Sequence, residues 1–253
     1  MHILIVGSPR SRTSYMASAC ANQYKIKNFH EDYDDYFSDF YERNRLLKKP
    51  IEIHDVVKKR ELFLQNYTNN LFDMPGCVIK LFPRHIITLQ HADKILKKID
   101  DLKYQVIENI SDILRLQDFD KIYVMHRSLV ESAISFAYAK QVGYMLYIFP
   151  QKVKNKKLTI QQNVLDELNY FLLENIVLED LQTFLNNNYN CINLDFHKAI
   201  EYVDIEFTDK GQIMYQDPKY NYKNLILNYS EVEDYIHKTF SNLQSKRIEC
   251  NFR

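Results

Sequence analysis

The sequence predicts an α/β fold in three layers, with a mainly parallel central sheet flanked by helices. Residues 3–6, Ile-Leu-Ile-Val, form a continuous apolar run that ends at Gly7, which is typical of a strand covered on both faces. Further apolar strand patterns occur at 77–83, 121–127 and 191–194, and helical spacing dominates between them. No repeat or low-complexity linker interrupts this order, so we expect one domain over residues 1–253.

The composition excludes several classes of protein. The 33 basic and 33 acidic residues balance, which argues against nucleic acid or an anionic membrane as an obligatory partner of the whole surface. No apolar run approaches the roughly 18 residues of a membrane span, and no signal segment is evident, so we expect a cytoplasmic protein. The four cysteines, Cys20, Cys77, Cys191 and Cys250, are scattered without a C-x-x-C pair, which indicates neither disulfides nor a metal site.

The first candidate site follows the first strand, in residues 7–14. Open α/β sheets bind ligands at the carboxyl ends of their strands, and a helix N-terminus favours an anion. Arg10 and Arg12 add positive charge there, so the segment predicts a cradle for phosphate or sulfate. It is not a Walker A loop, because Arg12 and Thr13 stand where that pattern needs Gly and Lys.

The second candidate site follows the strand predicted at 121–127. Ser128 and Glu131 form a capping box for a new helix, on which the hydroxyls of Ser128, Ser132 and Ser135 share one face. Arg127 stands at the end of the strand, in front of that face. A guanidinium beside hydroxyl donors is suited to a second phosphate.

Both sites resemble those of sulfotransferases that use 3′-phosphoadenosine 5′-phosphosulfate (PAPS). Pro9, Arg10, Ser11, Thr13 and Ser14 match the family's 5′-phosphosulfate loop, and Arg12 replaces its usual Gly. The family's 3′-phosphate motif has a Ser eight residues after an Arg, as Ser135 follows Arg127. The resemblance implies a P-loop-like fold and transfer of a sulfuryl group from PAPS to a hydroxyl or amine, on a saccharide, lipid, small molecule or protein.

The resemblance also implies roles for individual residues. Residues 9–14 would bind the phosphosulfate, with Arg10 stabilising charge on the leaving oxygen, and Arg127 with Ser135 would bind the 3′-phosphate. Glu31 is the best candidate for the base, and His30 is the reserve. The cytosolic branch has a catalytic His between a strand's Lys and a following Pro, and here 81–82 are Leu and Phe.

Other segments complete the prediction. A helical insertion around 32–75 is expected to cover the acceptor site, Lys219 or Lys223 to close over the nucleotide, and His85 to be structural or on the surface. Residues 91–116 have mostly helical spacing, and Ser230 with Glu233 predicts the cap of the last helix. Two alternatives to a sulfotransferase remain: a nucleotide-dependent phosphotransferase, and a non-catalytic nucleotide- or sulfate-binding protein on the same fold.

Overall fold

The computed structural model describes residues 1–9, 11, 13–29, 53–89, 104–142, 157–196, 221–246 and 250–253. Its centre is a five-stranded sheet in the order β2-β3-β1-β6-β7, in which every pair of neighbours is parallel. The strands are β1 (His2–Val6), β2 (Lys27–Phe29), β3 (Cys77–Leu81), β6 (Lys121–His126) and β7 (Cys191–Asp195). The predicted α/β fold with a mainly parallel sheet is therefore confirmed.

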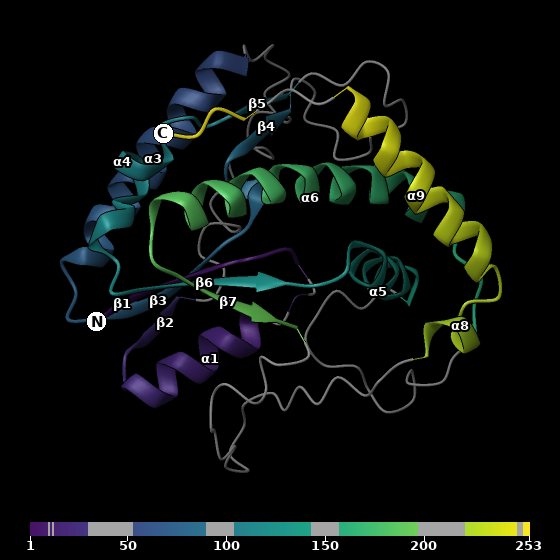
Figure 1. Cartoon of the computed structure of the whole chain (residues 1–253), viewed down its shortest axis with the longest axis horizontal. Coiled ribbons are helices and arrows are strands. Elements are labelled where there is room, and N and C mark those ends of the chain that lie inside the picture. The colour runs from purple at the N-terminus through teal and green to yellow at the C-terminus, as the bar shows by residue number, and fades with distance from the viewer. Residues whose placement is uncertain are drawn as a thin grey trace, which may run out of the picture.

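Helices cover both faces of the sheet, and α1 (Thr13–Tyr24) lies on the face opposite α6 (Gln162–Asn188) (Figure 1). The remaining helical elements are α3 (Ile53–Phe72), η1 (Pro83–His85), α4 (Ile110–Leu114), η3 (Leu116–Asp118), α5 (Leu129–Val142), α8 (Tyr222–Leu225) and α9 (Tyr229–Ser245). In Figure 1 the yellow α9, which follows the short α8 in the chain, crosses the right-hand end of α6.

The alternation of side chains along β1 divides the core into two clusters. Ile3 and Ile5 pack with Met16 and Cys20 of α1. Leu4 and Val6 point to the other face and pack in the cluster that includes α3, α5, α6 and α9. A continuous apolar strand is thus explained by burial on both faces, because successive residues serve opposite layers.

A small antiparallel pair of strands corrects the sequence prediction for 91–116. β4 (Ile87–Leu89) pairs with β5 (Tyr104–Val106), so residues 104–106 are strand and not helix. Residues 110–114 are helical as predicted, in α4. A three-residue strand is too short to show period-two alternation, and its pairing with β4 overrides the local helical spacing.

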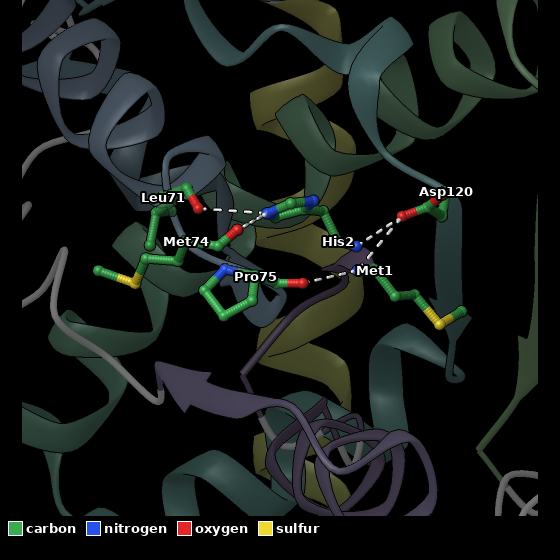
Figure 2. Close-up of polar contacts among 6 residues, drawn as sticks. All are labelled: Met1, His2, Leu71, Met74, Pro75 and Asp120. Carbon is green, nitrogen blue, oxygen red and sulfur yellow. Dashed lines mark hydrogen bonds and ion pairs between the residues drawn. The ribbon is translucent and has the colours of Figure 1, made fainter.

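Contacts at the amino ends of the strands fix the register of the sheet (Figure 2). The backbone N–H of His2 donates to Asp120 Oδ2 at 2.6 Å, and the imidazole Nε2 lies 3.2 Å from the carbonyl oxygens of Leu71 and Met74. Asp120 precedes β6 and Met74 precedes β3. His2 of β1 therefore contacts the segments that lead into both neighbouring strands. The carboxyl ends of β1 and β3 are level in this register, because their last residues, Val6 and Leu81, pair with each other.

Three predictions at the edges of the fold have different outcomes. The expected helical insertion contains α3, which lies in the described part of that range. The last helix begins at Tyr229, so Ser230 lies inside it and is not its cap. Asn228 holds the N-cap position, and its Oδ1 accepts a hydrogen bond from Ile160 N instead. No helix in the described ranges is long and apolar enough to cross a membrane.

Candidate anion site at the carboxyl ends of the strands

The two predicted sites lie beside each other at the centre of the sheet. β1 and β6 are neighbours, and the chain leaves β1 toward β2 but leaves β6 toward β7. The carboxyl ends of such a pair form the topological switch point where open α/β sheets bind ligands. Val6 pairs with Val124, so β6 extends two residues beyond β1, to His126. Arg127 therefore follows a strand end that stands farther out than Gly7.

The loop after β1 is tightly closed on itself. Ser11 donates from its backbone N and its Oγ to the carbonyl oxygen of Ser8, at 3.2 and 2.6 Å. A Cβ on Gly7 would lie 2.7 Å from Ser11 Oγ and 3.0 Å from Met125 Cβ. The absence of a Cβ at Gly7 is thus a steric requirement, because Ser11 and Met125 lie too close to leave room for one. Pro9, Ser11 and Thr13 are all buried within this closed path.

Lys80 is the cation that the structure adds to this loop. It lies on β3, its side chain is 1% exposed, and its Nζ donates to Ser14 Oγ at 2.8 Å. Ser14 is in the first turn of α1, so the ammonium group lies at the N-terminal end of that helix. A buried ammonium is costly unless it is paired or hydrogen-bonded.

Lys80 and the positive end of the α1 dipole both favour a negative group at the first turn of α1. The positive end of a helix dipole disfavours a nearby cation and favours a negative group. Lys121 has the opposite placement, because its Nζ donates at 2.7 Å to Tyr24 Oη, in the last residue of α1. The dipole thus favours Lys121 and opposes Lys80. An anion between Lys80 and the first turn of α1 would attract both, and the electrostatic energy of the Lys80 ammonium would become favourable.

The guanidinium of Arg127, at the second predicted site, stacks on an aromatic ring. Its side chain is 6% exposed, and its guanidinium carbon lies 3.9 Å from the centre of the Phe196 ring, just after β7. The Arg127 Nε lies 3.9 Å from Oε2 of Glu131, in the first turn of α5. Stacking on the ring fixes the plane of the guanidinium, and a desolvated guanidinium interacts strongly with an anion.

Ser135 lies on α5 as predicted, and its hydroxyl is engaged by another part of the chain. The residue is fully buried, and the Tyr222 hydroxyl donates to Ser135 Oγ at 3.0 Å. Ser132 is also buried and donates to the carbonyl oxygen of Leu129, whereas Ser128 is exposed. The three hydroxyls predicted on one face therefore have different environments, and Ser135 is the one joined to the C-terminal segment.

Other predicted site residues are distributed as follows. His85 is buried and its Nδ1 accepts a hydrogen bond from the backbone N–H of Phe82, so it supports the turn after β3. Lys223 is exposed on α8, with its Nζ 5.4 Å from the centre of the Tyr229 ring. Arg10, Arg12, His30, Glu31 and Lys219 lie outside the described residues.

Sequence reasoning gave no role to three residues that the structure joins to the two sites. Lys80 had a visible signal, because it is the charged residue within the apolar strand 77–81. Phe196 and Tyr222 had none, since each meets its partner across a long sequence separation, which is 87 residues for Tyr222 and Ser135. Tertiary contacts of this kind leave no local pattern.

Within the described residues, no group of three or more His, Cys, Asp or Glu side chains is placed to hold a metal ion. Comparison of the chain with protein-family models, with curated proteins and with solved structures found no match.

Proposed function

We propose that this chain is a sulfotransferase that moves a sulfuryl group from PAPS to a hydroxyl or amine acceptor. The observation that carries the proposal is Lys80, whose buried ammonium lies against the first turn of α1, so that its charge and the positive end of the helix dipole both favour an anion there. The resemblance of residues 9–14 to a 5′-phosphosulfate loop gives that anion its identity. Arg127, stacked on Phe196 after the neighbouring strand, supplies a second cation for a donor with two separated anionic groups.

The proposed reaction needs charge stabilisation more than covalent chemistry. The acceptor oxygen or nitrogen attacks sulfur, and the bond from sulfur to the bridging oxygen of PAPS breaks. Negative charge develops on that oxygen as 3′-phosphoadenosine 5′-phosphate (PAP) leaves, and Arg10 with Lys80 would stabilise it. The acceptor's proton would go to Glu31, with His30 as the reserve. The late cation of the family would be Lys219 or Lys223.

Titration calorimetry with PAP tests the donor site. Wild type is expected to bind PAP in the micromolar range and in preference to ATP with magnesium. Arg127→Ala should weaken PAP binding by about 1–3 kcal/mol, because a charge-assisted hydrogen-bond pair is lost. Arg115→Ala is the matched control, since Arg115 lies just before η3 and pairs with Asp118 at 2.6 Å. Release of PAP from PAPS in the presence of mixed hydroxyl and amine acceptors then tests turnover.

The outcomes separate the three candidate functions. Binding of PAP without turnover with any acceptor class supports a non-catalytic binding protein. Preference for ATP with magnesium supports a phosphotransferase and contradicts the proposal. Absence of PAP binding also contradicts it.

A further inference from the structure

Tyr222, the first residue of α8, is joined to the residue that the 3′-phosphate motif singles out. Its hydroxyl donates to Ser135 Oγ at 3.0 Å from the other end of the chain. The motif itself contains no such tyrosine, and the contact arises only because the C-terminal segment folds back over α5.

The phenol is held in place by its surroundings. The Tyr222 ring packs against Tyr138 of α5, with 5.6 Å between ring centres. Leu225 and Ile226 are buried behind it, and Leu158 is bonded on both sides, donating to Leu225 O at 2.9 Å and accepting from Leu227 N at 2.8 Å. Backbone pairing and apolar burial thus fix α8, so the hydroxyl keeps a defined position above Ser135.

The two bonded hydroxyls belong to residues of different exposure. Ser135 is fully buried, whereas Tyr222 is half-buried. Because the Tyr222 hydroxyl is bonded to the buried Ser135 Oγ, a phosphate that bound Ser135 would also meet the phenol. A phenol hydroxyl is a good neutral donor, and it adds a hydrogen bond to phosphate without burying another charge.

We propose that Tyr222 is a further ligand of the 3′-phosphate, an inference that rests on the proposed function. On binding, its hydroxyl turns from Ser135 Oγ to a phosphate oxygen, and the Ser135 hydroxyl donates its own proton to the same phosphate. The C-terminal segment thereby becomes part of the donor site and gives selectivity for nucleotides with a 3′-phosphate.

The test compares PAP with adenosine 5′-phosphate, which lacks the 3′-phosphate, on wild type, Tyr222→Phe and Tyr235→Phe. Tyr222→Phe keeps the ring against Tyr138 and removes only the hydroxyl. It is expected to weaken PAP binding by about 5- to 10-fold and to leave adenosine 5′-phosphate binding unchanged. Tyr235→Phe removes another partly buried tyrosine hydroxyl, which donates to Asn169 Oδ1 at 2.8 Å. It should leave the ratio of the affinities for PAP and adenosine 5′-phosphate as in wild type.

Each other outcome overturns the inference. An equal loss for both nucleotides in Tyr222→Phe means that the hydroxyl only supports the fold. Full retention of the PAP preference means that Ser135 acts without it. If wild type itself does not prefer PAP over adenosine 5′-phosphate, the proposed donor site fails first, and the role of Tyr222 fails with it.

Discussion

Lys80 brings a buried ammonium to Ser14 in the first turn of α1, and Ser11 and Thr13 are buried beside it. Ser11 and Thr13 belong to a strand-loop-helix pattern that is visible in a few consecutive residues, and the structure buries both in the loop. Lys80 reaches Ser14 across 66 residues of sequence. The sequence shows that a lysine interrupts an apolar strand, but only the parallel pairing of β1 with β3 brings it to the loop.

Replacing Lys80 by methionine is expected to separate ligand binding from stability. Methionine has a similar volume and removes a buried charge, so the free energy of unfolding should stay within about 1 kcal/mol of wild type or rise. The increase in unfolding temperature on adding PAP should disappear, because the variant lacks the cation at the α1 N-terminus. Thermal unfolding with and without PAP measures both effects.

Lys121→Met is the control for that experiment. It removes the lysine at the opposite end of α1, and the PAP-dependent shift should persist. A Lys80→Met variant that retains the full shift would show that the anion is held without this ammonium.

At the scale of elements, four of the five strands of the parallel sheet follow from local patterns because each is short, apolar and bounded by turn or helix signals. β2 was not predicted, because its three residues, Lys-Asn-Phe, form no apolar run. β7 is the weakest case: its pattern predicts a buried strand, but it lies at the edge of the sheet and only Leu194 is fully covered. β4 and β5 could not be predicted, because what defines them is their pairing with each other. The loop between β1 and α1 is intermediate, since its composition predicts a turn and only the structure shows the contacts of Gly7, Ser8 and Ser11.

Gly7→Ala tests these contacts. The added Cβ would meet Ser11 Oγ at 2.7 Å and Thr13 Cγ2 at 2.9 Å, so the loop must shift to accept it. We expect a loss of about 1–3 kcal/mol in the free energy of unfolding, measured by urea denaturation, together with weaker PAP binding. Gln23→Ala, on the exposed side of α1, should change stability by no more than about 0.5 kcal/mol. A Gly7→Ala variant as stable as wild type would mean that the loop takes another course.

At the scale of the whole molecule, burial of two thiols predicts that the free energy of unfolding falls as the pH becomes alkaline. Burial raises the pKa of Cys20 and of Cys77 from 9.0 to about 11. The folded state therefore keeps these protons where the unfolded state loses them. Stability from this source is fully present below pH 9 and is lost as the pH rises from 9 to 11.

Urea denaturation at intervals from pH 8 to pH 11 checks this expectation. Cys20 and Cys77 should each lower the free energy of unfolding by about 2–3 kcal/mol over this range, because one pKa unit corresponds to about 1.4 kcal/mol. Cys20→Ala should begin less stable at pH 8, because it leaves a small cavity, and should lose less stability toward pH 11. Parallel profiles for Cys20→Ala and wild type would assign the alkaline fall to other groups.

Helix α1, which carries the proposed anion site, also covers one face of the central sheet. Of the helices in the described residues, α1 is the one that packs on the Ile3 and Ile5 face of the sheet. Its first turn belongs to the proposed anion site, while its inner side covers the strands. The proposed donor site therefore predicts that local opening of α1 and release of the nucleotide are coupled, so that nucleotide binding would reduce the opening of α1.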